Sequence, residues 1–172
     1  MRFRLFFSVF MVVAGLFGTA MPAAARSAGE SELVAFGGYQ TGTIVVRTAE
    51  RHLYFVVGDG HAIRYPIAVG RPGKEWAGAT YVARKAEYPV WSPPAEVRRD
   101  KPSLPTLIPP GPRNPLGPRA LVLAAGEYAI HGTNNPDSIG TKASYGCIRM
   151  YNQHILDLYE RVNVGTPVVV VQ

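Results

Sequence analysis

Residues 130–150 read IHGTNNPDSIGTKASYGCIRM, and no other window of the chain concentrates as many reactive side chains. A predicted strand ends at His131, where a loop begins, and the loop ends where Cys147 enters a short strand that precedes a helix. Catalytic groups are most often found on loops that a rigid scaffold positions. This window therefore indicates both a candidate site and the elements that present it.

A cysteine and a histidine at the two ends of one loop can act as a nucleophile and its base. The thiolate of Cys147 would attack, and the imidazole of His131 can take the thiol proton and hold the ion pair. Gly146 allows a tight turn whose N–H groups can bind an oxyanion, and Arg149 can clamp a carboxylate from the same strand face. The residues alone leave open that Cys147 is a small buried side chain and His131 an ordinary core or surface residue.

The sequence outside this window predicts a mainly β domain. Runs of β-branched and aromatic residues, separated by turn residues, predict strands at residues 44–46, 53–57, 63–69, 80–83, 121–123, 128–130 and 168–171. The last run is apolar on both faces, which predicts a central place in its sheet. One helix is expected after the cysteine, with Asn152 as its N-cap and an apolar stripe from Ile155 to Val162.

Residues 88–118 differ from the rest, with ten prolines in 31 positions. This density excludes a central strand and the interior of a helix. A long loop inside a compact domain is usually a functional flap or a linker. Trp91, Leu104 and Ile108 supply apolar anchors, which favour an ordered flap.

The beginning of the chain is typical of a secretory signal peptide. Arg2 and Arg4 precede an uncharged apolar run, which ends in Pro22 and small residues before a cleavage site after residue 25. The alternative is an uncleaved membrane anchor. We expect a signal peptide over 1–25, a flexible tail over 26–42, and an exported protein in the periplasm or cell envelope.

Composition excludes several classes of function. The chain has 172 residues, which fits one domain, and a single cysteine, which allows no internal disulfide, Cys₄ zinc site or CxxC pair. No HExxH motif or acidic cluster is present, so we expect no metal and no cofactor. The net charge of +6 is a mild signal for solubility or an anionic partner. We expect a monomer with no nucleic-acid partner.

The window resembles the signature of the L,D-transpeptidase catalytic domain (YkuD-like). The resemblance rests on HGT at 131–133 and SYGCIRM at 144–150, with similar stretches at 111–117 and 164–168. It implies a catalytic domain over 43–172, with the exported, β-sandwich-like fold of that family and the cysteine at a cleft.

The resemblance also implies a reaction. In that family a cysteine attacks the amide between an L-centre and a D-centre of a peptidoglycan stem tetrapeptide, and the terminal D-alanine leaves. An amine of a second stem then resolves the thioester, which gives a 3→3 cross-link. Carried over, Cys147 is the nucleophile, His131 is the base and acid, and the Gly132 carbonyl orients the imidazole.

Further roles follow from the same resemblance. Backbone N–H groups of Tyr145, Gly146 and Cys147 would hold the oxyanion, and the flap over 88–118 would cover the donor. The side chains expected to contact substrate are Arg149, Ser144 and Trp91. Many members carry histidine where this chain has Tyr145, which leaves His131 as the base.

The motif leaves the acyl acceptor open. Water as acceptor would make the protein an L,D-carboxypeptidase, and an amine of an envelope protein would make it an attachment enzyme. A non-catalytic wall-binding module is a more distant alternative, which predicts that Cys147 and His131 are dispensable.

Overall fold

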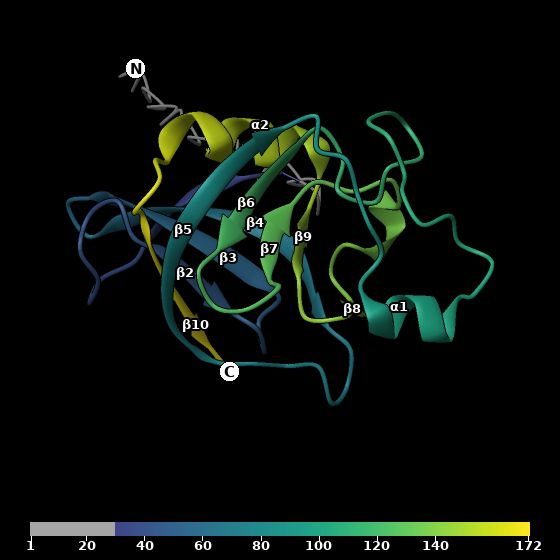
Figure 1. Cartoon of the computed structure of the whole chain (residues 1–172). Coiled ribbons are helices and arrows are strands. Elements are labelled where there is room, and N and C mark those ends of the chain that lie inside the picture. The colour runs from purple at the N-terminus through teal and green to yellow at the C-terminus, as the bar shows by residue number, and fades with distance from the viewer. Residues whose placement is uncertain (1–29) are drawn as a thin grey trace, which may run out of the picture.

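The computed structural model describes residues 30–172 (Figure 1). The predicted signal peptide and residues 26–29 of the predicted tail lie outside these residues. The elements are β1 (Glu32–Ala35), β2 (Ile44–Arg47), β3 (His52–Gly58), β4 (His61–Gly70), β5 (Gly78–Glu87), α1 (Ala95–Asp100), β6 (Arg119–Leu123), β7 (Ala129–His131), the 3₁₀ helix η1 (Pro136–Ser138), β8 (Lys142–Ser144), β9 (Ile148–Met150), α2 (Asn152–Arg161) and β10 (Pro167–Val171). No helix within residues 30–172 is long and apolar enough to cross a membrane.

The strands form a barrel-like sheet rather than an open one. Their order is β1-β4-β3-β2-β10-β5-β6-β7-β9, and β9 also pairs with β4, so the path returns to its second strand. The prediction of a mainly β, sandwich-like domain is confirmed, and each of the seven predicted strands is present. Closure leaves few unpaired strand edges, which are otherwise exposed to pairing with other chains.

Strand β4 closes the path because it changes partners along its length. Its first half pairs with β1 and β3, and beyond Pro66 it pairs with β9 through Ile67 and Ala68. A proline has no N–H to donate to a ladder, so it suits the point where pairing changes. Strand β4, from the first half of the chain, is thereby joined to β9, the strand after Cys147.

Strand β10 occupies the central place that its sequence predicts. It runs parallel to β2 on one side and antiparallel to β5 on the other. Val168 and Val170 point into the core and are almost fully buried. The last strand of the chain thus joins its first half to its second.

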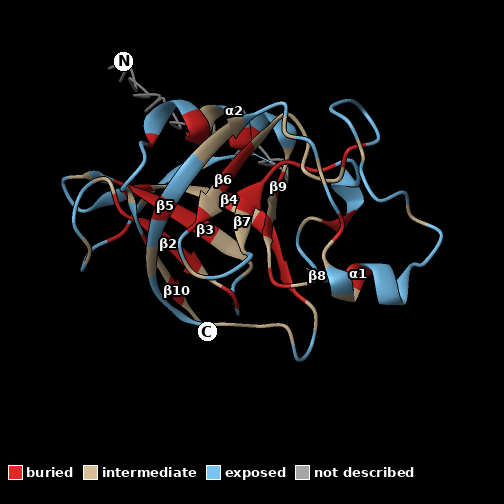
Figure 2. Ribbon diagram, viewed as in Figure 1, coloured by how far each residue is buried: buried red, intermediate tan, exposed pale blue. Residues whose placement is uncertain are grey.

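Helix α2 covers β6 and β7 with the predicted apolar stripe (Figure 2). Ile155 and Leu158 are fully buried in the same core cluster as the strand residues. The prediction of Asn152 as N-cap is wrong. Tyr151 is the N-cap, and Asn152 is the first helical residue, whose side chain accepts a hydrogen bond from elsewhere in the chain.

The prediction of a flexible tail over 26–42 is wrong for the strand that it contains. Residues 32–35 form β1, which pairs with β4. Phe36, which follows, stacks on Tyr54 at 4.3 Å and belongs to a second apolar cluster. The strand has only four residues and follows a small, polar stretch, so its local signal is weak, and an edge strand needs to bury only one face.

The proline-rich segment contains a short helix that its composition did not predict. Helix α1 fills the proline-free interval between Pro94 and Pro102, and Pro94 is its N-cap. A proline before the first turn leaves no helical hydrogen bond unmade. The segment is also tied to itself, because Trp91 and Ile108 exchange backbone hydrogen bonds of 2.9 and 2.8 Å.

Candidate active site

Neighbouring strands bring His131 and Cys147 to the same region. Strand β7 pairs in parallel with β9, which places His131 beside Arg149 and Ile130 beside Ile148. Cys147 directly precedes Ile148, so the thiol lies next to the end of the histidine strand. His131 is buried, whereas Cys147 is partly exposed.

The imidazole of His131 is held in one tautomer. Its Nδ1 lies 2.6 Å from the carbonyl oxygen of Gly132, and a carbonyl can only accept, so Nδ1 carries the proton. The other nitrogen, Nε2, therefore keeps its lone pair. Within residues 30–172 no hydrogen bond joins this ring to Cys147, whose Sγ lies 3.9 Å from the oxygen of Glu127.

Burial keeps both groups neutral in the free protein. It lowers the pKa of His131 to about 4, helped by the charge of Arg149 and opposed by the Gly132 hydrogen bond. Burial also raises the pKa of the Cys147 thiol. The Ala129 N–H and the Arg149 charge lower this pKa, but their effect is smaller. The expected thiolate–imidazolium pair is therefore not the resting state. At neutral pH the pair is a thiol and an imidazole.

Ser144 fixes the loop that carries the cysteine. Its hydroxyl donates to the Cys147 oxygen at 2.5 Å and accepts from the Gly146 N–H at 3.0 Å. Ser144, a predicted substrate contact, is 1% exposed, so its side chain offers almost no surface to a substrate. The N–H of Gly146, a predicted oxyanion donor, is already bonded to Ser144. The N–H groups of Tyr145 and Cys147 have no partner within residues 30–172.

A stacked aromatic pair supports the same loop and was missed by the sequence analysis. Trp76 and Tyr128 stack at 4.6 Å, and Trp76 Nε1 donates to the Gly146 oxygen at 2.9 Å. Gly146 has φ 116°, and a Cβ there would lie 2.5 Å from the Tyr128 ring. Glycine is therefore required at this position both by its conformation and by the close approach of the ring.

Asn152 holds the turn that follows His131. Its Oδ1 accepts from the Thr133 N–H at 2.8 Å. A Cβ on Gly132 would lie 2.4 Å from that oxygen, and one on Gly117 would lie 2.5 Å from it. The first residue of α2 thus sets the position of the carbonyl group that orients the imidazole.

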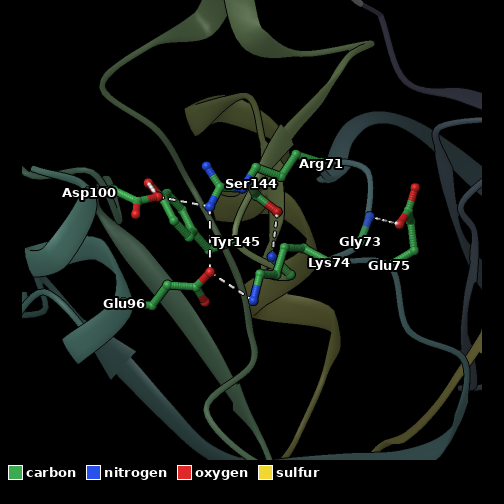
Figure 3. A network of polar contacts seen from close by, with 9 residues as sticks. Arg71, Gly73, Lys74, Glu75, Glu96, Asp100, Ser144 and Tyr145 are labelled. Carbon is green, nitrogen blue, oxygen red and sulfur yellow. Dashed lines mark hydrogen bonds and ion pairs between the residues drawn. The ribbon is translucent and has the colours of Figure 1, made fainter.

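Polar contacts join the cysteine loop to helix α1 (Figure 3). The Tyr145 hydroxyl donates to Asp100 Oδ2 at 2.8 Å, and Arg71 Nη2 bonds the same oxygen at 2.8 Å. The Arg71 guanidinium also lies 4.0 Å from the centre of the Tyr145 ring. Glu96 pairs with Lys74 at 2.7 Å. The Tyr145 phenol therefore faces the proline-rich segment.

Trp91, Tyr145 and Arg149 line one cavity of about 270 Å³ between the proline-rich segment and the loop. Arg149 is partly buried, and its Nη1 lies 3.5 Å from the Ser138 hydroxyl. A larger cavity of about 850 Å³ lies beside β1, away from the predicted site residues. Within residues 30–172 no group of three His, Cys, Asp or Glu side chains is placed to hold a metal ion.

Comparison with known proteins gives the family of this chain. Residues 41–170 match the model of the L,D-transpeptidase catalytic domain, and the chain belongs to that family. It is 41% identical over 137 residues to the probable L,D-transpeptidase ErfK/SrfK of Escherichia coli K12. That match covers 74% of this chain but 43% of the relative, so the chain spans less than half the length of that protein.

Solved structures agree on the fold. An L,D-transpeptidase mutant from Enterococcus faecium matches with a TM-score of 0.61 at 22% identity, over 77% of this chain and 50% of that one. A Brucella melitensis structure matches at 42% identity with a TM-score of 0.55, over 83% of this chain and 93% of that one. The Brucella protein is described as a probable carnitine operon oxidoreductase, a name that belongs to that protein alone.

Proposed function

We propose that this protein is a cysteine-dependent L,D-transpeptidase that acts on peptidoglycan stem peptides outside the cytoplasmic membrane. Its family supports the reaction class. The observation that carries the proposal is the hydrogen bond from His131 Nδ1 to the Gly132 oxygen, beside the strand that follows Cys147. This bond leaves Nε2 as a base and needs no third side chain.

Acylation begins from the neutral pair. As Sγ of Cys147 attacks the carbonyl carbon before the terminal D-residue, Nε2 of His131 takes the thiol proton. The C–N bond then breaks, and the imidazolium returns this proton to the leaving amine. The products are a thioester on Cys147 and a free D-amino acid.

The negative charge of the tetrahedral intermediate needs donors that the loop has not already used. The N–H groups of Cys147 and Tyr145 meet this requirement, whereas that of Gly146 bonds Ser144. Preorganised backbone donors at such a position contribute about 3 kcal/mol of transition-state stabilisation each. Arg149 supplies a cation two residues from the nucleophile.

Resolution of the thioester repeats the chemistry with a second nucleophile. Nε2 accepts a proton from the incoming amine, the new amide forms, and the thiol is released. An amine of a second stem gives a 3→3 cross-link, water gives carboxypeptidase activity, and an amine of an envelope protein gives attachment. The same residues serve all three acceptors.

The test uses the purified protein and muropeptides with tetrapeptide stems. We expect an acyl-enzyme in the intact-mass spectrum, release of D-alanine, and a cross-linked dimer. Cys147→Ala should show no adduct, and His131→Ala should lower turnover by at least about 100-fold. The control is His61→Ala, because His61 also places Nδ1 near a carbonyl, Asp59 O at 2.7 Å, but is exposed.

The products identify the acceptor. A tripeptide without dimer indicates the carboxypeptidase, and a dimer indicates the transpeptidase. If the wild-type protein forms no adduct, or if Cys147→Ala forms the same one, the catalytic proposal is wrong. A wall-binding module then becomes the better hypothesis.

A further inference from the structure

The cavity between the proline-rich segment and the cysteine loop has an unusual set of charges. Three of the side chains that line it are cations, namely Lys101, Arg113 and Arg149, and none is acidic. The lining also includes the apolar side chains of Trp91 and Ile108. A cavity with this lining suits a ligand that carries a negative group on an apolar or peptide framework.

The acidic residues of the neighbouring helix do not neutralise these cations. Glu96 pairs with Lys74, and Asp100 with Arg71, on the side of α1 that faces the cysteine loop (Figure 3). Within residues 30–172, none of the three cavity cations takes part in an ion pair. The fold therefore separates paired charges, which hold α1 in place, from unpaired cations, which face the cavity.

Arg149 links this cavity to the reacting groups. It is the register partner of His131 across β7 and β9 and follows Cys147 by two residues. Among the residues that the structure describes, its side chain makes one hydrogen bond, to the Ser138 hydroxyl at 3.5 Å. A partly buried guanidinium with so few partners gains most from a carboxylate, which it can bind through two parallel hydrogen bonds.

We propose that this cavity is a subsite for a carboxylate of the acyl-donor peptide. Arg149 is its partly buried anchor, and Lys101 and Arg113 are exposed cations that attract the same group. This inference rests on the proposed function. It adds that the enzyme recognises the donor peptide by one of its carboxylates. Two carboxylates of a stem peptide have this chemistry, the one at its C-terminus and the one on a side chain.

The experiment measures binding without chemistry. Full-length Cys147→Ala is titrated by calorimetry with one tetrapeptide in three forms: both carboxylates free, only the C-terminal one amidated, and only the side-chain one amidated. We expect one amidated form to bind about tenfold more weakly than the free form, as charge-assisted contacts to a carboxylate require. This difference in affinity should shrink at 0.5 M salt, because Lys101 and Arg113 are exposed and salt screens their charges.

Variants of the cavity residues test whether the cavity causes this difference in affinity between the peptides. In the Cys147→Ala background, adding Lys101→Ala and Arg113→Ala should weaken binding of the free form by about fivefold and leave the sensitive amidated form within twofold. The matched control adds Arg98→Ala and Arg99→Ala instead. It removes the same charge from exposed positions on α1 that do not line the cavity.

The outcomes separate this inference from the proposed function. Equal binding of all three peptides, equal effects of the two double variants, or no measurable binding overturns the carboxylate subsite. Discrimination between the peptides by Cys147→Ala, together with no acyl-enzyme on the wild-type protein, keeps the subsite and overturns the transpeptidase.

Discussion

At the scale of single residues, the pair Cys147 and His131 is neutral because both groups are desolvated. The hydrogen bond from Nδ1 to Gly132 fixes the ring but does not offset the cost of burying a charged imidazole. In the reaction that we propose, the proton therefore moves during attack rather than before it. A neutral thiol is also a weaker nucleophile than a thiolate, which limits its reaction with other electrophiles.

This burial predicts a pH dependence of stability. The pKa of His131 is about 4 in the folded protein and ordinarily 6.5, so the unfolded chain binds the proton first as pH falls. The stabilisation is complete above pH 6.5 and is lost as pH falls towards 4. The loss is about 3 kcal/mol, from the difference between the two pKa values.

Urea unfolding at pH 7 and pH 4 measures this loss. The control is His131→Asn, which has no titrating group at this position, so other acid-sensitive groups cancel in the comparison. We expect the wild type to lose about 3 kcal/mol more free energy of unfolding than the variant over this interval. Equal losses would show that the imidazole is solvated in the folded protein.

At the scale of elements, the cysteine loop and helix α1 are joined by Tyr145, Asp100 and Arg71 (Figure 3). These contacts lie at the surface, where solvent screens them, so each is weak by itself. They hold a six-residue helix that would not be stable alone. The position of the proline-rich segment thus depends on a side chain of the motif.

Tyr145→Phe should loosen α1 without affecting the core. The change removes one hydrogen bond to Asp100, and we expect amide hydrogen exchange in residues 95–101 to increase about two- to fivefold. Tyr81→Phe on β5 is the control, because the Tyr81 side chain is exposed and its hydroxyl makes no hydrogen bond within residues 30–172. Unchanged exchange in Tyr145→Phe would mean that other contacts hold the helix.

Tyr145→His should keep its activity, since the backbone N–H at this position, rather than the phenol, is proposed to contact the reacting atoms. The measurement is turnover with the stem tetrapeptide at saturating concentration. A folded Tyr145→His protein that does not acylate would assign the phenol a role in the reaction itself.

At the scale of the whole molecule, the closed strand path depends on β10, which pairs with both β2 and β5. Val168 is fully buried in the core, and Val169, the next residue, is partly exposed on the opposite face. Because both residues are valines in the same strand, replacing each by alanine removes the same groups from a buried and from a partly exposed position.

Val168→Ala should lower the free energy of unfolding by about 2 kcal/mol, and Val169→Ala by less than about 1 kcal/mol. Thermal or urea unfolding measures both. Equal effects would show that the two faces of β10 are equally packed, which contradicts the burial pattern of the strand.

Local sequence patterns were sufficient to predict the mainly β architecture and to find the motif. Apolar runs with turn residues between them are local signals, and they located each predicted strand and helix α2. His131, Cys147 and Arg149 were found because they lie within one short window. The fold of the proline-rich segment was only partly predictable, because α1 is stabilised by partners outside it.

The support of the site and the protonation of its groups depend on contacts between distant parts of the chain. Trp76 contacts Gly146 from 70 residues away, and Asn152 contacts the turn after His131 from the start of α2. Local patterns contain no signal for such contacts, because the closed sheet creates them. The solvation of the His131 imidazole and the Cys147 thiol also depends on the whole fold, because every element packed around these groups contributes to their burial. Their neutral state is therefore a property of the assembled fold.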